Sequence, residues 1–222
     1  PAYMDLDVLY EDDHLLVVNK PAGVETHPSQ PGQSDTLLNG VAFHLMQEGT
    51  PCDFVHIHRL DKDTTGALLL AKHPFAGAIL HRMLEERAIK RTYKALVHGK
   101  LKNRQGTITG KIGKDRHHSS RRRVSQTGQH AVTHYRVLRY LASENLSLIE
   151  CRLETGRTHQ IRVHLSHLGH PLAGDTLYGG KPIFNRQALH AYRIEFIHPI
   201  TEEEIDIHAP FLDEPPLFPE GC

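Results

Sequence analysis

The chain has 222 residues, 23% of them charged and 39% apolar, and its 26 lysines and arginines balance 26 aspartates and glutamates. This composition is typical of a folded protein with one large domain or two closely joined lobes, and no apolar run is long enough to cross a bilayer. The acidic start lacks the pattern of a signal peptide, and three cysteines are a sparse, odd set, so we expect reduced thiols and a cytoplasmic location.

The net charge of zero conceals a strong asymmetry. The segment 87–123 carries 13 basic residues and one acid, whereas residues 195–222 carry eight acids and neither Lys nor Arg. A basic block of this kind is typical of proteins that bind a polyanion, although solvated strand and helix faces would also produce it. We favour nucleic acid as the partner.

Apolar periodicity predicts the following elements in chain order. Segments 6–10 and 15–19 resemble a hairpin, and 36–47 has helical spacing with Asp35 as a possible N-cap. Further helices are predicted at 75–90 and 158–168, and further strands at 67–72, 92–98, 131–141, 146–153, 189–197 and 205–207. The polar, basic segment 100–128 is expected to be a mobile arm or an extended hairpin.

Strands outnumber helices in this prediction and mostly follow one another directly. That order favours an α+β fold with a mixed, largely antiparallel central sheet flanked by helices and loops, because a wound parallel sheet needs alternating elements. We find no internal repeat, and no linker is long enough to demand two independent domains. We therefore expect a single domain over 1–222, with two sublobes around one cleft as an option.

The segment HRLDKDTTG, residues 58–66, contains the strongest candidate for chemistry. Asp61 follows an arginine and precedes a Thr-Thr-Gly turn and an apolar strand, which places an acid on a loop of a rigid scaffold. A lone Asp is more often a turn former than a catalyst, and Asp63 fits that simpler role. An arginine close to Asp61 would keep its carboxylate ionised and oriented in a partly dry cleft.

The segment GRTHQIRVH, residues 156–164, supplies two such arginines. Arg157 and Arg162 are five residues apart and cannot share one helix face, so one is expected to face a cleft and the other solvent or phosphate. Arg162 lies among apolar residues and needs a partner, which could equally be any structural acid. Tyr93, between basic residues, could stack on a nucleobase or pack in the core as an ordinary strand tyrosine.

The 19 histidines include two patterns that a metal site could use. His56 and His58 would lie on one side of a strand, and His164, His167 and His170 have helical i, i+3 spacing. The ligand run His-x-His-x-Asp of metallo-β-lactamase-like hydrolases does not match, because two residues separate His58 from Asp61. We therefore predict no metal and, without a glycine-rich phosphate loop, no nucleotide cofactor.

Five collinear motifs identify the family that the chain resembles. They are VLYEDDHLLVVNKPAGVETHP (8–28), HRLDKDTTGALLLAK (58–72), KRTYKALVHG (90–99), TGRTHQIRVHLSHLGHPLAGDTLYG (155–179) and LHAYRIEFIHP (189–199). The chain resembles the RluA family of RNA pseudouridine synthases over nearly its whole length. The family commonly has Thr-Ser-Gly at positions 64–66, where this chain has Thr-Thr-Gly. Many members also carry an N-terminal RNA-binding domain; we expect that this domain is absent here or was removed.

The resemblance implies the pseudouridine synthase fold and the isomerisation of uridine to pseudouridine. The substrate would be structured RNA, either large-subunit ribosomal RNA or transfer RNA. The enzyme would act as a monomer and would need no cofactor. Asp61 would be the catalytic carboxylate, Arg162 its ion-pair partner, and Tyr93 the ring that stacks on the flipped-out uracil. The residues assigned to RNA binding are Arg59, Lys20, Arg157, Arg121, Arg122 and Arg123. Two other classes stay open, namely a non-catalytic RNA-binding or chaperone module and a metallohydrolase.

Overall fold

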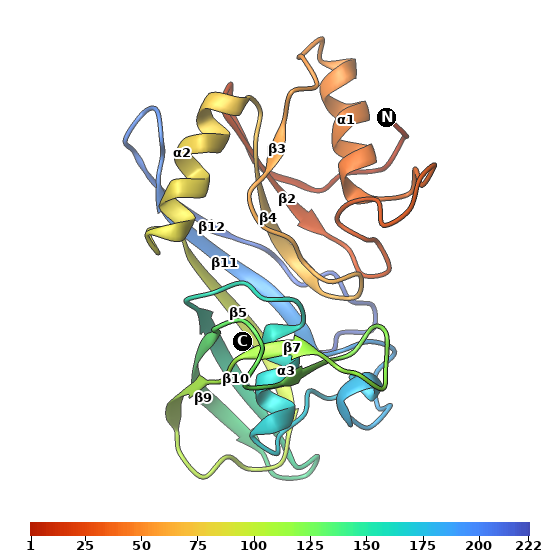
Figure 1. Cartoon of the computed structure of the whole chain (residues 1–222), viewed down its shortest axis with the longest axis vertical. Helices are drawn as coiled ribbons and strands as arrows, with labels where there is room; N and C mark the ends of the chain where they lie inside the picture. The colour runs from red at the N-terminus through yellow and green to blue at the C-terminus, as the bar shows by residue number, and fades with distance from the viewer. The chain divides into compact units, whose positions relative to one another are not determined.

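A computed structural model describes the whole chain, residues 1–222. The chain divides into two compact units. Unit 1 consists of Pro1–Arg91 and Ala191–Leu212, and unit 2 consists of Thr92–His190 and Asp213–Cys222 (Figure 1). None of the helices combines the length and the apolar character that crossing a bilayer requires.

The strands of unit 1 form an apolar sheet. Strand β1 (Val8–Glu11) pairs antiparallel with β2 (Leu15–Lys20), which confirms the predicted hairpin, and β2 pairs antiparallel with β4 (Thr65–Ala71). The short β3 (Val55–His56) pairs with β4, while β11 (Leu189–Ile197) follows β4 in the strand order and carries β12 (Glu204–His208). All residues of β2 and β4 are buried, so both faces of these two strands are covered.

Two helices complete unit 1, α1 (Leu37–Gln47) and α2 (Pro74–Glu85). The N-cap of α1 is Thr36, not the predicted Asp35. The backbone amide and the hydroxyl of Thr36 both donate hydrogen bonds to the side-chain oxygen of Asn39. Helix α2 packs its Ala76 and Leu80 onto the odd-numbered residues of β2 and β4. It ends five residues earlier than predicted, since Arg87 takes a positive φ of 60°.

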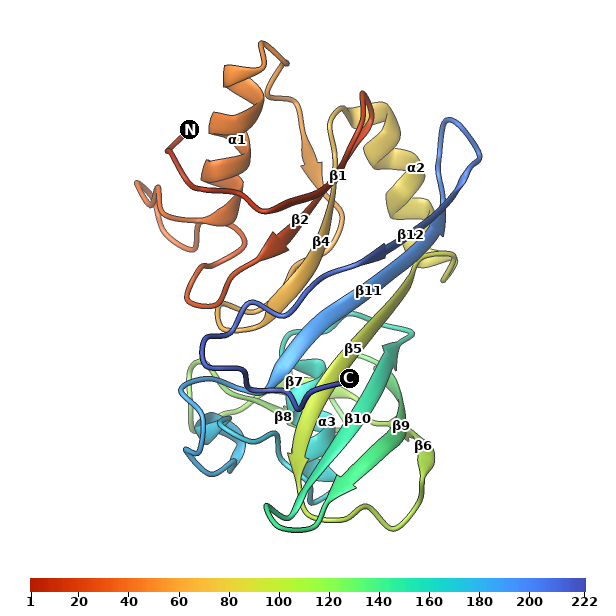
Figure 2. The ribbon, with the colours of Figure 1, turned by 180° about the vertical axis from the view of Figure 1, so that it is seen from behind.

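Unit 2 is built on a second set of antiparallel strands, in the order β5-β10-β9-β6 (Figure 2). Their bounds are Lys90–His98 for β5, Gln105–Thr109 for β6, Val132–Leu141 for β9 and Leu146–Leu153 for β10. Helix α3 (Gln160–His167) covers one face of these strands, where Gln160 and His164 bond to β9. The strands β5, β9 and β10 follow the predicted segments within two residues.

The basic segment 100–128 is folded against unit 2. Besides β6, it forms a hairpin of β7 (Ile112–Lys114) and β8 (Arg122–Val124). This hairpin packs on α3 and on the short 3-10 helix η1 (Thr176–Tyr178) through a core of Ile112, Ala131, Val163 and Tyr178. Of the two predicted alternatives, the hairpin is confirmed, and β6 is an additional sheet strand. Mostly antiparallel strands with three α-helices confirm the α+β fold class.

Candidate active site

Asp61 lies in the loop between β3 and β4 of unit 1. Along this loop Arg59 is exposed, Leu60 is buried, and Asp61 is half-buried. The backbone carbonyl of Asp61 accepts a hydrogen bond from the amide of Thr64, 3.1 Å away, which closes a turn directly before β4. The carboxylate is therefore carried by a tight turn at the start of a fully buried strand.

Four hydrogen bonds from the end of β2 and the segment after it hold this turn. The hydroxyl of Thr26 donates to the carbonyl of Leu60 at 2.8 Å and accepts from the amide of Leu60 at 3.2 Å. The ammonium of Lys20 donates to the carbonyl of Lys62, and the carboxylate of Asp63 accepts from the amide of Gly23. The backbone is thus tied on both sides of Asp61, an arrangement that keeps a reacting group in one orientation.

Lys20, one of the residues predicted to bind RNA, lies inside unit 1. Its side chain is fully buried, and its ammonium donates hydrogen bonds to the carbonyls of Pro21, Val24 and Lys62 at 2.7–2.8 Å. A buried, hydrogen-bonded ammonium does not present its charge on a surface for RNA. The hydrogen bond to Lys62 shows that Lys20 anchors the Asp61 loop, and its assignment to RNA binding stays a prediction.

Gly66, the last residue of the HRLDKDTTG segment, is required by close packing. Its φ is +117°, and a Cβ at this position would lie 2.2 Å from the backbone oxygen of Ala191 in β11. Any side chain would push these two strands of unit 1 apart. The glycine of the motif is thus a packing requirement of the strand that follows the Asp61 turn.

The predicted histidine series do not form ligand sets. The His58 ring is buried, and its Nε2 accepts a hydrogen bond from the amide of Leu69. Burial, together with the nearby charges of Arg91 and His56, lowers the pKa of His58 to about 3. His56 stacks on His27 instead. On α3, both ring nitrogens of His164 are hydrogen-bonded, Nδ1 to Thr133 and Nε2 to the carbonyl of Gly110. Neither series supports the metallohydrolase alternative.

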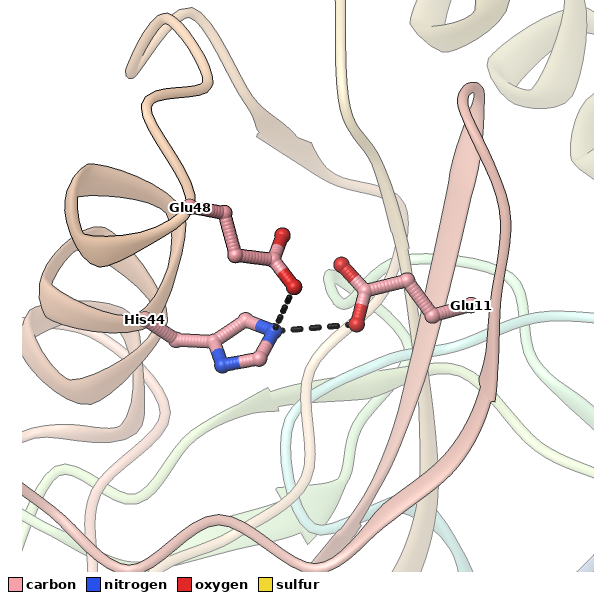
Figure 3. Close-up of side chains that lie close together, drawn as sticks. All are labelled: Glu11, His44 and Glu48. Atoms are coloured by element: carbon pink, nitrogen blue, oxygen red, sulfur yellow. Dashed lines mark hydrogen bonds and ion pairs between the residues drawn. The ribbon is translucent and has the colours of Figure 1, made fainter.

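One other set of side chains has the spacing of metal ligands, namely Glu11, His44 and Glu48 (Figure 3). His44 Nε2 lies 2.9 Å from Glu11 and 3.5 Å from Glu48. The ammonium of Lys72 already balances these carboxylates, at 2.9 Å from Glu11 and 3.7 Å from Glu48. Burial opposes ionisation of Glu11, yet hydrogen bonds from Lys72 and His44 outweigh it and lower the pKa of Glu11. The cluster is an ion-pair network that ties α1 to β1 and the end of β4.

The other two predicted catalytic residues belong to unit 2. Tyr93 lies on β5 opposite Cys151 of β10, and only 4% of it is exposed. Arg162 lies on α3 and is also buried, as its apolar neighbours predicted. Within unit 2 its partner is Asp175, to which the guanidinium donates two hydrogen bonds. Asp175 was not singled out from the sequence, although it lies in the motif GHPLAGDTLYG.

The arginines of unit 2 that were predicted to bind RNA differ in exposure. On the β7–β8 hairpin, Arg121 and Arg123 are exposed and Arg122 is half-buried. Arg121 is 3.7 Å from Asp115 and stands over the ring of Tyr178. The Nε of Arg157 donates to the carbonyl of His130 at 2.9 Å, and this side chain is half-buried. Among these predicted residues, Arg121 and Arg123 are the ones whose charge is most available to a polyanion.

A profile of the family described as RNA pseudouridylate synthase matches residues 14–167, more than half of the chain. The chain belongs to this family. A pseudouridine synthase is an isomerase, so the chain is an enzyme and not a non-catalytic RNA-binding module. Family members act on RNA, so RNA is the class of substrate.

Individual relatives agree with this assignment. The synthase is 56% identical over 212 residues to the uncharacterized RNA pseudouridine synthase YhcT of Bacillus subtilis, a match that covers 95% of this chain and 70% of the relative. It is 43% identical over 230 residues to the ribosomal large subunit pseudouridine synthase D of Vibrio cholerae, covering 95% of this chain and 69% of that protein.

The fold agrees with solved structures of the same class. The human RNA pseudouridylate synthase domain containing 1 superposes with a TM-score of 0.73 at 29% identity, over 93% of this chain and 84% of that one. The human domain containing 4 gives a TM-score of 0.74 over 93% and 88%, at 24% identity. The synthase therefore has the pseudouridine synthase fold that the motifs implied.

Proposed function

We propose that this synthase converts specific uridines of large-subunit ribosomal RNA into pseudouridine, with Asp61 as the catalytic carboxylate. The choice of RNA is supported by the relative from Vibrio cholerae and by the ribosomal large subunit synthases D of Nitrosomonas europaea and Neisseria meningitidis, which are 43–44% identical to this chain. The observation that carries the catalytic assignment is the turn of Asp61, which is anchored on both sides.

The reaction rearranges one nucleotide without any net change of composition. The bond between the sugar C1′ and N1 of uracil breaks, the base turns, and a bond forms between C1′ and C5. The hydrogen on C5 leaves as a proton, and N1 takes up a proton. Because substrate and product are isomers, the conversion consumes no oxidant or reductant.

Asp61 can start this sequence in three ways. Its carboxylate could attack C1′ or C6, or it could remove the 2′ proton to give a glycal. Each route needs an ionised, oriented acid, and the hydrogen bonds at Leu60 and Lys62 hold the backbone on both sides of Asp61. A base within a helical stack cannot reach such a group, so the target nucleotide must be flipped out.

The other predicted residues complete the proposal. Tyr93 stacks on the everted uracil, and Arg162 pairs with Asp61 and keeps it ionised. Arg59, exposed two residues before Asp61, contacts the flipped nucleotide. Arg157 and the arginines of the β7–β8 hairpin, Arg121, Arg122 and Arg123, bind RNA phosphates. The enzyme acts in the cytoplasm, where ribosomal RNA substrates occur, and it acts as a monomer.

The test is a comparison of pseudouridine maps of total RNA from cells with and without this gene. We expect one or more pseudouridines of large-subunit ribosomal RNA to disappear with the gene and to return when it is restored. Loss of sites only in transfer RNA would overturn the proposed target and leave the enzyme class intact. Maps that are identical in every RNA would overturn the proposal itself.

A further inference from the structure

Arg162 and Asp175 form a two-point ion pair inside unit 2. The Nε of Arg162 donates to Asp175 Oδ2 at 2.7 Å, and Nη2 donates to Oδ1 at 3.0 Å. The exposed fractions of the two side chains are 8% and 1%. A planar fork bound at two points has little freedom to rotate, so the carboxylate fixes the plane and the direction of the guanidinium.

A tyrosine ring fixes the same guanidinium from its face. The central carbon of the Arg162 guanidinium lies 5.0 Å from the centre of the Tyr178 ring, within the range of a cation–π contact. The Tyr178 hydroxyl accepts the amide of Arg122 at 2.9 Å and lies 2.6 Å from Nδ1 of His159. The tautomer of His159 determines which of the two groups donates in this second bond. The ring is thus held at its outer end by β8 and by the N-terminus of α3.

We propose that Asp175 is a positioning residue for catalysis, acting through Arg162 with Tyr178 as its support; this inference rests on the proposed function of Asp61 and Arg162. Asp175 binds the Nε–Nη2 edge of the guanidinium, and Nη1 lies on the other edge. Asp175 and Tyr178 therefore determine which edge of the Arg162 guanidinium stays available for its proposed role. Asp175 itself touches neither the RNA nor the reacting atoms.

The charge of Asp175 has a second consequence for this arrangement. A buried guanidinium is costly unless an anion compensates it, and Asp175 supplies that anion within unit 2. Arg162 can therefore stay buried and ordered before substrate binds. A catalytic arginine that is preorganised in this way contributes to the reaction step more than to RNA affinity.

Unit 2 contains a second ion pair of the same geometry, which serves as a matched control. Arg186 donates from Nε and Nη2 to the two oxygens of Asp213, both at 2.8 Å, and the exposed fractions are 3% and 11%. Arg186 has no place in the proposed chemistry. Replacing Asp213 therefore breaks a largely buried pair of the same bonding pattern without changing Arg162.

The experiment measures kcat and KM by release of tritium from RNA labelled at C5 of uridine. It compares the parent with Asp175→Asn, Asp213→Asn, Arg162→Met and the double variant Arg162→Met/Asp175→Asn, and melting temperatures are recorded for all of them. We expect Asp175→Asn to lower kcat by about 10- to 100-fold, the range produced by a misplaced catalytic group, with little change in KM. Asp213→Asn should lower the melting temperature but keep kcat near the parent value.

The double variant separates positioning from structure. Because it removes both charges of the pair, it leaves no uncompensated ion. Its kcat should equal that of Arg162→Met alone, since Asp175 then has nothing left to position. Equal losses of kcat in Asp175→Asn and Asp213→Asn, a parental kcat in Asp175→Asn, or multiplying effects in the double variant would each overturn the inference.

A second variant keeps the test decisive where Asp175→Asn fails to fold. Tyr178→Leu removes the ring beneath the guanidinium without removing a charge. It should lower kcat at unchanged KM, and it should have no further effect in the Arg162→Met background; a further loss there would contradict the inference. A parent enzyme that releases no tritium from any RNA would instead mean that the proposed function has failed.

Discussion

The ammonium of Lys20 donates a hydrogen bond to the backbone carbonyl of Lys62, 2.8 Å away and 42 positions later in the chain. This contact connects the end of β2 to the residue that follows Asp61. The same ammonium binds the carbonyls of Pro21 and Val24, so one buried charge organises both segments. The loop that carries the proposed catalytic acid therefore depends on a lysine that is not exposed to RNA.

Replacement of Lys20 by Met should destabilise the protein and not weaken its salt-dependent RNA binding. Hydrogen bonds to charged groups contribute roughly 1.5–3 kcal/mol each, so we expect a loss of at least about 2 kcal/mol of unfolding free energy. Urea unfolding measures this loss. The slope of log K for RNA against log salt should match that of the parent, because no phosphate contact is removed.

The matched control is Lys62→Met. Lys62 is exposed, and only its backbone carbonyl takes part in the contact with Lys20. The unfolding free energy of the Lys62→Met variant should stay near that of the parent. A Lys20→Met protein of parental stability and reduced salt slope would show that Lys20 contacts RNA after all.

The elements that could be predicted were those with a clear apolar period. The alternation in 146–153 and in 189–197 corresponds to β10 and β11 residue for residue. The end of α2 could not be predicted, because Arg87 takes a left-handed conformation that any non-glycine residue adopts only rarely. Strand β6 was missed because its polar sequence gains its order from pairing with β9.

The candidate site was predictable only as far as its motifs were. The HRLD segment indicated Asp61, but no local pattern distinguishes a buried lysine from one that binds phosphate. Lys20 is buried because three carbonyls surround its ammonium, and two of them come from the chain turn directly after it. Asp175 is 13 residues from Arg162, and only the packing of η1 against α3 brings the two together.

The ring of Tyr93, more than its hydroxyl, should determine activity. Stacking of a base on an aromatic side chain is worth about 1–3 kcal/mol, so Tyr93→Ala should lower kcat/KM by roughly 5- to 150-fold. Tyr93→Phe keeps the ring and should retain most of the activity. Tritium release from C5-labelled RNA measures both. Equal losses in the two variants would show that the hydroxyl, not stacking, is what the reaction needs.

The exposed arginines of the β7–β8 hairpin, Arg121 and Arg123, should determine the salt dependence of RNA binding. Each phosphate contact removed lowers the slope of log K against log salt by about 0.7 for single-stranded and about 0.9 for duplex nucleic acid. We expect Arg121→Gln and Arg123→Gln to show this change in filter-binding titrations. Arg193→Gln, which breaks an ion pair with Asp206 in unit 1, is the control and should keep the parental slope. A parental slope in both hairpin variants would remove the β7–β8 hairpin from the RNA interface.

Asp12 should make stability depend on pH in acid. Burial raises its pKa, but hydrogen bonds from the amides of His14 and Leu15 and from the side chains of Tyr10 and His198 outweigh this and lower it to about 2. An unfolded aspartate titrates near 3.9, so the stabilisation is complete above about pH 4 and is lost as pH falls toward 2.

Urea unfolding of Asp12→Asn at several pH values tests this dependence. The variant should be less stable than the parent at pH 6, and the difference should shrink by pH 2.5. Asp13→Asn, at the exposed neighbouring position, should follow the parent at every pH. A difference between Asp12→Asn and the parent that stays constant from pH 6 to 2.5 would contradict the role of the Asp12 charge.

The central claim is that Asp61 carries out the reaction. Asp61→Asn keeps the size of the side chain and the backbone bond to Thr64 but removes the ionisable acid. Asp63→Asn, on the same loop, is the control, since an amide oxygen can still accept from Gly23. Both variants should unfold at the parental temperature within a few degrees.

The most direct measurement is tritium release from C5-labelled large-subunit ribosomal RNA by the parent, Asp61→Asn and Asp63→Asn. We predict release by the parent and by Asp63→Asn, and none above background by Asp61→Asn even after long incubation with excess enzyme. Release by a folded Asp61→Asn protein at a rate comparable to the parent would contradict the account.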